Sequence, residues 1–419
     1  MYGSVPTVPK ALADYTPLIG ETQVQEIRAL AEHVKGARVL HLNATAFGGG
    51  VAELLGTLVP LMRDVGLAAD WQVIRGADEF FQVTKSIHNA LQGMPLPWTP
   101  AMAELWLRYN RMNAELFDET YDFIVIHDPQ PAGILALLTE LRGRRPPGKW
   151  IWRCHIDLTA AVAAVWEFLR PYVDVYDAAI FTMREYVKSD LRVPLTVVIP
   201  PAIDPLSPKN TPLDPAAAAD VLRRYGVDPA RPLLCQVSRF DPWKDPLGVI
   251  DVYRQVKTVV PTVQLALIAS MAADDPEGWA YYERTARHAG EDYDIHLLSN
   301  LNGVGNVEVN AFQRCADVVI QKSLREGFGL VVAEALWKGR PVVGSNVGGI
   351  PLQIVDGENG YLVDSVAACA ARVLHLLQHP ALADAMGARG REHVRKHFLI
   401  TRYLRDYLRL FVELVAGAP

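Results

Sequence analysis

Residues 318–338 read VVIQKSLREGFGLVVAEALWK, and this stretch carries the pattern that decides the fold. The apolar, β-branched run Val318–Gln321 predicts a buried strand. A glycine-containing turn follows it, and the apolar-rich segment Leu330–Lys338 predicts a helix. Residues Pro341–Gly344 are apolar again, so the stretch predicts a strand, a crossover helix and a second strand parallel to the first.

The same alternation extends through most of the chain. Short apolar runs alternate with helix-length amphipathic segments, which is typical of a parallel sheet covered by helices on both faces. The other expected strands are Arg38–Leu42, Ala69–Ile74, Phe123–Ile126, Trp150–Arg153, Ala178–Phe181, Thr196–Ile199, Leu233–Val237, Val263–Ile268 and Ile295–Leu298. The expected helices include Glu21–Val34, Val51–Val65, Pro100–Phe117, Gly133–Leu141, Pro246–Val259, Gly278–Ala289, Val307–Cys315, Ala367–Leu377, Ala381–His397 and Arg402–Val415. The fold class expected is therefore α/β and doubly wound.

The alternation breaks once, in a proline-rich stretch after residue 199. Six prolines lie between residues 200 and 215, and they disfavour regular structure there. A chain of 419 residues is also too long for one ordinary hydrophobic core. We therefore expect a linker in this stretch, with one α/β domain before it and a second after it.

Charge and composition exclude several classes of protein. The 41 basic and 47 acidic residues give a net charge of -6 with no basic stripe, which argues against a nucleic-acid binder. The chain shows no secretory apolar region and no uncharged stretch long enough to cross a bilayer, so a cytoplasmic protein is expected. The cysteines are scattered and predict buried thiols rather than a zinc site: Cys154, Cys235, Cys315 and Cys369.

Ligands of doubly wound domains bind at the carboxyl ends of strands, so the loops there are the candidate sites. After the strand Arg38–Leu42, residues 43–50 read NATAFGGG and lead into a helix. Backbone amides such as those of Gly49 and Gly50 could approach a phosphate or a sugar oxygen closely. The loop matches neither GxGxxG nor a P-loop, and a tight turn explains its glycines almost as well.

A second loop, residues 238–244, reads SRFDPWK and follows the strand Leu233–Val237. Arg239 and Lys244 could clamp a diphosphate, because the guanidinium binds two oxygens at once and the ammonium acts as a point charge. For this loop taken alone, two solvated surface charges are the simpler interpretation.

The turn within residues 318–338 provides a third candidate site. Glu326 precedes a Gly-Phe-Gly turn, and Glu334 lies on an otherwise apolar helical face. A carboxylate there is costly unless it accepts hydrogen bonds, which two ribose hydroxyls could donate. Alternatively, Glu334 pairs with Lys338 one turn further on. The pair Gly348-Gly349 follows the next strand and forms another turn that exposes its backbone.

Two expected strands of the first half each end in a histidine with a carboxylate nearby, namely His127-Asp128 and His155-Ile156-Asp157. Such groups could hold sugar hydroxyls or act as acid and base. A metal site is the less favoured alternative, because no third ligand recurs at a metal spacing. Asp292-Tyr293-Asp294 precedes a strand and is interpreted as a surface loop.

Together these motifs resemble a known family. Arg239 and Lys244, followed by Glu326-Gly327-Phe328-Gly329-Leu330 with Glu334 and then Gly348-Gly349, resemble the donor-site signature of GT-B-fold retaining glycosyltransferases of family 4. Four further segments resemble the trehalose glycosyltransferring synthases within that family: HLNAT at 41–45, HDPQP at 127–131, WRCHID at 152–157 and DPEGW at 275–279. The retaining trehalose phosphorylases share much of this pattern. The resemblance covers nearly the whole chain.

The resemblance implies two Rossmann-like domains that face a central cleft. Residues 1–205 plus 398–419 would form the N-terminal, acceptor-binding domain, and residues 206–397 would form the C-terminal domain, which binds the nucleotide-sugar donor. The expected catalytic residues are His155, Arg239, Lys244 and Glu326. The expected donor or nucleotide ligands are Gly49, Gly50, Arg239, Lys244, Gly327, Phe328, Gly329, Leu330 and Glu334. The expected acceptor ligands are Asp128, His127 and Asp157.

Each implied role follows the chemistry of the group. Arg239 and Lys244 would neutralise the leaving diphosphate, Glu334 would hold the ribose, and Glu326 would hold hydroxyls of the donor sugar. His155 would lie near the reacting glucosyl unit, and Asp128 would lie at the acceptor. One departure is a glutamate that many members carry shortly after the glycine pair, where this chain has Pro351-Leu352-Gln353; we interpret this as a mark of the trehalose-forming branch.

The expected reaction is transfer of glucose from ADP-, UDP- or GDP-glucose to glucose, with retained configuration, to give α,α-trehalose. It is expected to be reversible and to need no metal or cofactor, and the protein is a possible homodimer. A retaining trehalose phosphorylase is the first alternative, although a ribose ligand such as Glu334 would then have no partner. A non-catalytic sugar-binding protein and an NDP-sugar epimerase are the others.

Overall fold

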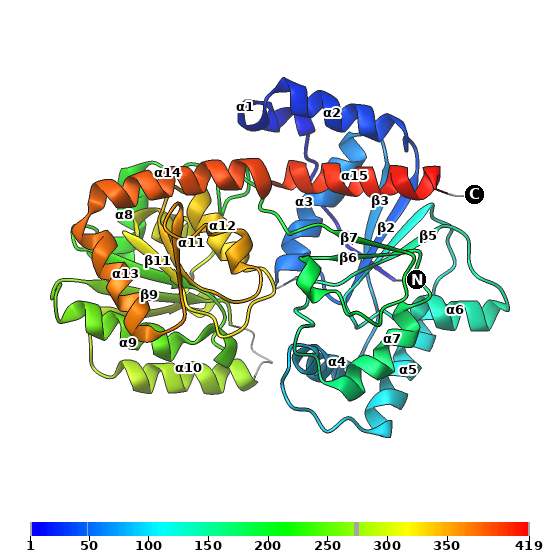
Figure 1. The fold of residues 1–419 in the computed structure, drawn as a ribbon, viewed down its shortest axis with the longest axis horizontal. Helices are drawn as coiled ribbons and strands as arrows, with labels where there is room; N and C mark the ends of the chain where they lie inside the picture. Colours follow the sequence, from blue (N-terminus) through cyan, green and yellow to red (C-terminus); the bar gives the residue numbers. More distant parts are fainter. Residues whose placement is uncertain (1, 48, 272–275, 418–419) are drawn as a thin grey trace. The chain divides into compact units, whose positions relative to one another are not determined.

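Two parallel β-sheets, each with its own helices, organise the chain (Figure 1). The computed structural model describes residues 2–47, 49–271 and 276–417, so Gly48 and Asp275 of the motifs above lie outside the described residues. Unit 1 comprises Met1–Pro201 and Ile400–Pro419, and unit 2 comprises Ala202–Leu399. These boundaries lie a few residues from those expected from the sequence.

The sheet of unit 1 has the strand order β1-β3-β2-β4-β5-β6-β7. All neighbouring strands are parallel except β1, which pairs antiparallel with β3 at the edge. The strands are β1 (Gly3–Ser4), β2 (Arg38–Asn43), β3 (Ala68–Val73), β4 (Phe123–His127), β5 (Lys149–Arg153), β6 (Ala178–Phe181) and β7 (Leu195–Val198). Strands β2 to β7 match the expected runs to within one residue at each end, because each strand is built mainly of apolar residues, as is usual in a parallel sheet.

Helices cover both faces of this sheet. They are α1 (Thr16–Ile19), α2 (Glu21–Glu32), α3 (Gly50–Asp64), α4 (Asp78–Leu91), α5 (Pro100–Glu115), α6 (Ile134–Arg142), α7 (Ala163–Val173) and α15 (Ile400–Ala416). The short α1, together with α4 and α7, lies in segments for which the sequence carried no prediction above.

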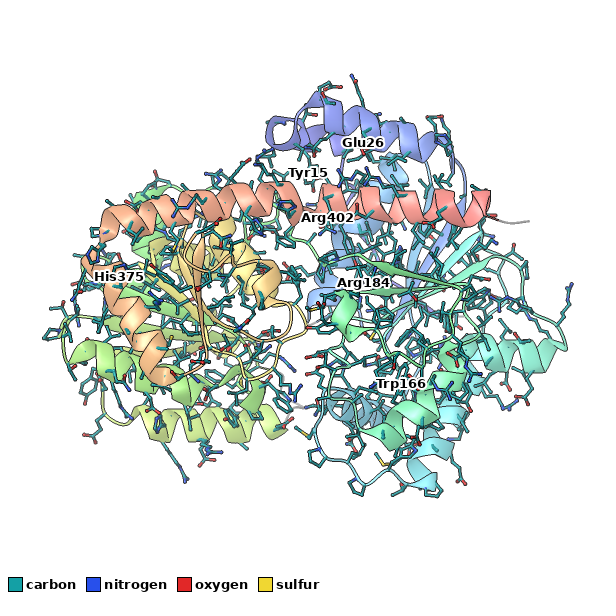
Figure 2. All side chains as sticks on the ribbon, in the orientation of Figure 1. Tyr15, Glu26, Trp166, Arg184, His375 and Arg402 are labelled. Carbon is teal, nitrogen blue, oxygen red and sulfur yellow. The ribbon has the colours of Figure 1, made fainter. Side chains whose placement is uncertain are left out.

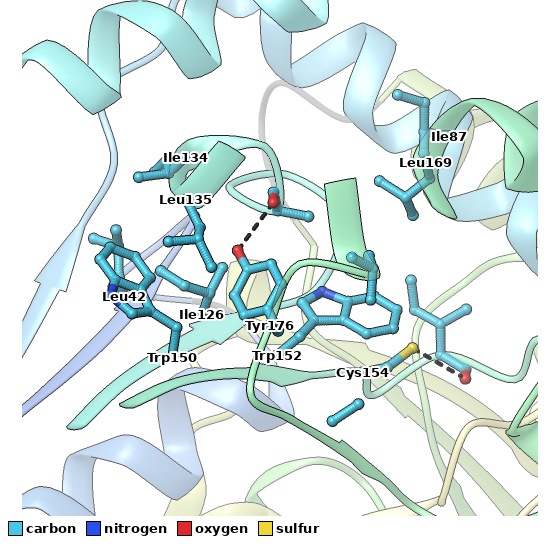
Figure 3. Close-up of a cluster of buried hydrophobic side chains, with 14 of the residues drawn as sticks. Leu42, Ile87, Ile126, Ile134, Leu135, Trp150, Trp152, Cys154, Leu169 and Tyr176 are labelled. Carbon is cyan, nitrogen blue, oxygen red and sulfur yellow. Dashed lines mark hydrogen bonds between the residues drawn. The ribbon is translucent and has the colours of Figure 1, made fainter. Parts of the chain in front are cut away.

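Side chains of β4 alternate between the two faces, as the two-residue period of a strand requires. Ile124 and Ile126 pack with Trp152 in the core under α4 to α7, part of which Figure 3 shows. Phe123 faces the opposite side and stacks on Phe411 of α15, with ring centroids 4.2 Å apart.

Helix α15 returns the end of the chain to unit 1, where it contacts α2 and α3 (Figure 1). The guanidinium of Arg402, labelled in Figure 2, donates to the carbonyls of Pro200 and Pro201, each at 2.8 Å. Arg409 pairs with Glu26 of α2 at 2.6 Å. These contacts attach residues 400–416 to a core built from the first half of the chain.

The sheet of unit 2 is parallel throughout and has the order β10-β9-β8-β11-β12-β13. The strands are β8 (Leu233–Val237), β9 (Gln264–Ala269), β10 (Ile295–Ser299), β11 (Val318–Gln321), β12 (Val342–Ser345) and β13 (Gly360–Val363). The helices are α8 (Pro215–Arg224), α9 (Pro246–Lys257), α10 (Pro276–Ala289), α11 (Asn306–Cys315), α12 (Leu330–Trp337), α13 (Val366–Gln378) and α14 (Pro380–His397). The strand–helix–strand prediction for residues 318–344 is confirmed by β11, α12 and β12, whereas β13 was not predicted.

The proline-rich stretch ends in a helix rather than continuing as linker. Pro215 is the first residue of α8, a position where the missing N–H costs nothing. The carboxylate of Asp214 accepts from the amides of Ala216 and Ala217, each at 3.0 Å, and so caps the helix.

The strand orders place one switch point in each sheet. In unit 1 the chain moves outward from β2 to β3 and then resumes on the other side of β2 with β4. In unit 2 it moves outward from β8 through β9 to β10 and then resumes on the other side of β8 with β11. The two loops that leave such a pair of strands run to opposite faces and leave a crevice between them. The loops after β2 and β4, and after β8 and β11, are therefore where ligand-binding groups are expected.

Two expectations from composition can be compared with the structure. No helix within residues 2–47, 49–271 and 276–417 is long and apolar enough to span a membrane. The four cysteines are free thiols, buried at Cys154, Cys235 and Cys369 and half-buried at Cys315. Burial raises the pKa of Cys235 to about 12, so this thiol stays protonated and unreactive.

We expect Phe411→Ala to lower the free energy of unfolding by about 3–5 kcal/mol, because it removes a buried ring that stacks on β4. Equilibrium urea denaturation measures the loss. Val415→Ala, on the same helix but 54% exposed, is the control and should change stability by less than about 0.5 kcal/mol. Equal effects of the two variants would show that α15 is not part of the core of unit 1.

Candidate active site

The loop after β8 in unit 2 holds the predicted cations Arg239 and Lys244. The 3-10 helix η3 (Pro242–Lys244) is capped by Asp241, whose Oδ1 accepts from the Lys244 amide at 3.1 Å. Gln236 Nε2 donates to the Lys244 carbonyl at 2.8 Å, so the backbone of this lysine is held from both sides. The Arg239 side chain is 64% exposed and lies 3.0 Å from Asp241. The loop thus fixes the lysine and leaves the arginine in solvent.

The loop after β11 meets the loop after β8 through an ion pair. Lys244 Nζ lies 2.7 Å from Glu326 Oε2, and the two side chains are only 14% and 10% exposed. The same carboxylate oxygen accepts from Ser323 Oγ at 3.2 Å and Gln321 Nε2 at 3.3 Å. An ammonium carries three N–H donors, so Lys244 can bind an anionic oxygen while it remains paired. The pair joins the two loops at the switch point of unit 2.

Glu334 is fully buried on α12, and its ion-pair partner is Lys209, not Lys338. Its Oε1 lies 3.1 Å from Lys209 Nζ, whereas Oε2 has no hydrogen-bond partner within the described residues. Lys338 instead donates from Nζ to Asn210 Oδ1 at 2.9 Å and Gln313 Oε1 at 2.8 Å. The alternative pairing considered above is therefore wrong. Lys209 was missed because it lies in the proline-rich stretch, outside any periodic pattern.

The two glycine turns of unit 2 lie in backbone contact. A Cβ on Gly349 would come within 2.7 Å of Phe328 Cα and 2.8 Å of the Gly327 carbonyl oxygen, so only glycine fits. Gly329 has a φ of +82° at the start of α12, which also favours glycine. Gln353, in the segment that departs from the family pattern, donates from Nε2 to the Phe328 carbonyl at 2.6 Å. An amide, not a carboxylate, is needed to make that bond.

In unit 1 the predicted histidines at the ends of β4 and β5 are joined to a third histidine on β2. His41 Nδ1 lies 3.0 Å from His127 Nε2, and His127 Nδ1 lies 3.1 Å from His155 Nε2. Both ring nitrogens of His127 are therefore occupied within unit 1, and no nitrogen of this ring is left for a sugar hydroxyl. His41 was quoted in the sequence only as part of a motif, because nothing local marks it as a partner of His127.

The predicted carboxylates of unit 1 shape the loops in which they lie. Asp128 adopts a left-handed backbone with a φ of 64°, and its Oδ1 accepts from the His155 amide at 2.8 Å. Burial raises the pKa of Asp128 to about 7. Asp157 Oδ1 accepts from the amide and the hydroxyl of Thr159, at 2.9 and 2.6 Å. Asp128 thus joins the loops after β4 and β5, whereas the Thr159 bonds of Asp157 lie within its own turn.

Arg153, at the end of β5, is a buried cation beside this group. Its side chain is fully buried, and its guanidinium lies over the ring of Tyr403 in α15, 6.0 Å from the centroid. After burial itself, the Arg153 charge is the strongest influence that lowers the pKa of His155. The sequence reasoning placed Arg153 in a strand and assigned it no role.

The loop after β2 leads into α3 through Gly49, whose φ of 141° lies outside the range favoured by other residues. Gly49 and Gly50 are exposed, and they start a helix of 15 residues whose first amides have no partner of their own within the helix. An anionic or sugar oxygen is a suitable acceptor for them. Phe47 in the same loop is 82% exposed.

Metal-ligating residues do not cluster in the described parts of the chain. No group of three or more His, Cys, Asp or Glu side chains there is arranged to hold a metal ion. The Asp292 and Asp294 carboxylates pair with Lys257, at 2.8 and 3.0 Å. The two aspartates are therefore engaged in an ion-pair cluster of unit 2 and do not belong to the loops after β8 and β11.

Family models of known proteins match both units of the chain. Residues 41–188 match the family model "Trehalose synthase, N-terminal domain", and residues 221–393 match "Glycosyl transferases group 1". A solved structure described as "Trehalose-6-phosphate from E. coli bound with UDP-2-fluoro glucose" superposes with a TM-score of 0.71 at 15% identity, covering 90% of this chain and 99% of that one. This likeness shows the GT-B glycosyltransferase fold.

Curated relatives match over nearly the full length. The trehalose synthase of Rubrobacter xylanophilus is 55% identical over 410 residues, which is 97% of each chain. The trehalose synthase of Thermococcus litoralis is 53% identical over 403 residues, which is 96% of each chain. A trehalose phosphorylase of Pleurotus pulmonarius is only 26% identical, and the match covers 91% of this chain and 58% of that protein. By this identity across both units, the chain belongs to the trehalose synthase family of glycosyltransferases.

Proposed function

We propose that the chain transfers glucose from an NDP-glucose to glucose, with retained configuration, and forms α,α-trehalose and NDP. The observation that carries this proposal is the arrangement at the switch point of unit 2. A buried ammonium on Lys244 is paired with Glu326, and Glu334 on the adjoining helix keeps one buried acceptor oxygen without a partner. The Lys244 ammonium suits the phosphates of a nucleotide sugar, the Glu326 carboxylate suits the hydroxyls of its sugar, and Glu334 Oε2 suits a hydroxyl of its ribose. The names of the full-length relatives support the product.

Departure of the nucleoside diphosphate is the step in which the cations of unit 2 would act. Negative charge grows on the bridging oxygen as the bond to the sugar breaks, and a cation already in place stabilises that charge without reorganisation. Lys244 is held by its backbone and by Glu326, so its position is set before substrate binds. Arg239 is exposed and can close on two phosphate oxygens when the donor binds.

Recognition of the donor would fall to α12 and the turn before it. Glu334 Oε2 accepts a hydrogen bond from a ribose hydroxyl, while Lys209 compensates the charge of the carboxylate. The Glu326 carboxylate, which Lys244 holds in place, accepts from hydroxyls of the glucosyl unit. Backbone amides of residues 327–330 supply further donors, since the glycines keep side chains away from them.

The acceptor and the reacting sugar would be bound by the strand ends of unit 1. His155 contacts a hydroxyl of the glucosyl unit, and the loop after β4, which begins with Asp128, forms the acceptor side. Retention follows if the acceptor hydroxyl attacks the face from which the phosphate leaves. The new bond from C1 to the acceptor oxygen forms as the bond from C1 to the phosphate oxygen breaks, and the phosphate takes the acceptor proton. No second carboxylate, metal or cofactor is required by this scheme.

We expect Lys244→Ala to lower kcat by about 100-fold or more, because it removes the cation that stabilises the leaving diphosphate. The assay follows trehalose formation from glucose with ADP-, UDP- and GDP-glucose in parallel. Lys396→Ala is the control; this lysine is 57% exposed on α14 and should leave the rate unchanged. An unchanged rate in Lys244→Ala would refute the site, whereas absence of trehalose with all three donors would refute the substrates.

Glu334→Gln tests whether a nucleoside is part of the donor. We expect KM for the NDP-glucose to rise about tenfold, the equivalent of one hydrogen bond, with a smaller change in kcat. Glu392→Gln, 46% exposed on α14, serves as the matched control. Formation of glucose 1-phosphate from trehalose and phosphate, unaffected by Glu334→Gln, would instead establish the phosphorylase reaction.

A further inference from the structure

The three histidines of unit 1 form a continuous chain of hydrogen bonds from the interior to the end of β5. His41 lies on β2, His127 is the last residue of β4, and His155 lies two residues past the end of β5; the two links measure 3.0 and 3.1 Å. His41 is fully buried, His127 is 1% exposed, and His155 is half-buried at the outer end. The planes of the His127 and His155 rings are nearly parallel, at 13° to each other, which is compatible with a bond between two ring nitrogens.

The surroundings of all three rings favour the neutral imidazole. Burial lowers the pKa of His41 to about 3 and lowers the pKa of His127 well below its usual range, with further contributions to His127 from its two histidine neighbours and Arg153. Burial and the charge of Arg153 likewise lower the pKa of His155 well below its usual range. A neutral imidazole has one N–H donor and one bare acceptor nitrogen. The middle ring, His127, must therefore donate to one neighbour and accept from the other.

The inner end of the chain decides which way the bonds run. His41 Nε2 is buried and has no hydrogen-bond partner among the described residues. A buried N–H without an acceptor is costly and rare, and a buried bare acceptor is tolerated more often. The proton of His41 is then on Nδ1 and is donated to His127 Nε2. His127 consequently carries its own proton on Nδ1 and donates it to His155 Nε2.

We propose that His127 is a positioning residue that keeps His155 protonated on Nδ1, so that His155 presents an N–H donor to its ligand. No hydrogen bond to His155 Nδ1 exists within the described parts of the chain, and that nitrogen is the one not engaged by His127. A donor at this position suits a hydroxyl oxygen of a sugar and cannot accept a proton from it. This inference rests on the proposed function in one respect, that the ligand of His155 is the reacting glucosyl unit.

The consequence for the reaction is specific. With Nδ1 already protonated, His155 orients the sugar and does not act as the base that deprotonates the acceptor. That proton goes to the departing phosphate, as in the scheme above. His127 touches no substrate, so it affects the rate only through His155.

Two amide substitutions at residue 127 separate the two bonds of its ring. In His127→Asn the amide nitrogen takes the place of Nδ1 and can still donate to His155, whereas in His127→Gln the amide reaches the place of Nε2 and meets His41 instead. We expect His127→Asn to retain kcat within about threefold and His127→Gln to lose about tenfold, the effect of one hydrogen bond. The readout is trehalose formation from the NDP-glucose that gives turnover, with KM measured alongside. His296→Gln, a half-buried histidine of unit 2, is the control and should leave kcat unchanged.

Nuclear magnetic resonance of the full chain labelled with ¹⁵N-histidine tests the proton position without any substrate. We expect the wild-type His155 signals, assigned by their loss in His155→Asn, to show a protonated Nδ1 and a bare Nε2, and His127→Gln to abolish that preference. A proton on Nε2 of wild-type His155, or equal kcat for the two residue-127 variants, overturns the inference. If no NDP-glucose is turned over, the proposed function fails, and the spectrum still decides the proton position.

Discussion

Parallel pairing of strands is the constraint on which both units depend. Parallel neighbours must be joined by a crossover helix, so every loop at the carboxyl end of a strand opens on the same edge of its sheet. In unit 1 this brings residues after β4 and β5 together, and in unit 2 it brings the loops after β8 and β11 within reach of the Lys244–Glu326 pair. The groups that carry the proposed chemistry are thus neighbours because of topology, although they lie far apart along the chain.

Each unit places polar groups in its interior and gives them partners in a different way, leaving some of their atoms without a hydrogen bond among the described residues. In unit 2 Lys209 pairs with one oxygen of the buried Glu334 carboxylate, and the other oxygen has no hydrogen-bond partner among the described residues. In unit 1 burial and the Arg153 charge lower the pKa of His127 and His155 and so favour their neutral form. The cost of burying these groups is the reason they are connected to fixed partners.

Much of the fold could be predicted because its signals are local. Buried parallel strands are mainly apolar, so β2 and β8 were recognisable from short apolar runs in the sequence. The edge strand β1 was missed because its two residues carry no periodicity, and β13 was missed because its apolar run is only the three residues Tyr361–Val363, directly after a glycine-containing turn. The candidate residues at strand ends were found because the strands that precede them were recognised. Their partners were not found, because Lys209 lies in irregular chain and nothing local distinguishes His41 from any other residue of a buried strand.

By itself, the sequence determined the doubly wound class of both units, the linker region, and the loops in which Arg239, Lys244, Glu326 and the histidines lie, because short-range periodicity and turn residues encode them. Tertiary structure alone decided which of these groups bond to one another. His41 and His127 are 86 residues apart, and Lys209 and Glu334 are 125 residues apart. Hydrogen bonds and ion pairs act only over a few ångströms, so such pairs exist only once the sheets have formed.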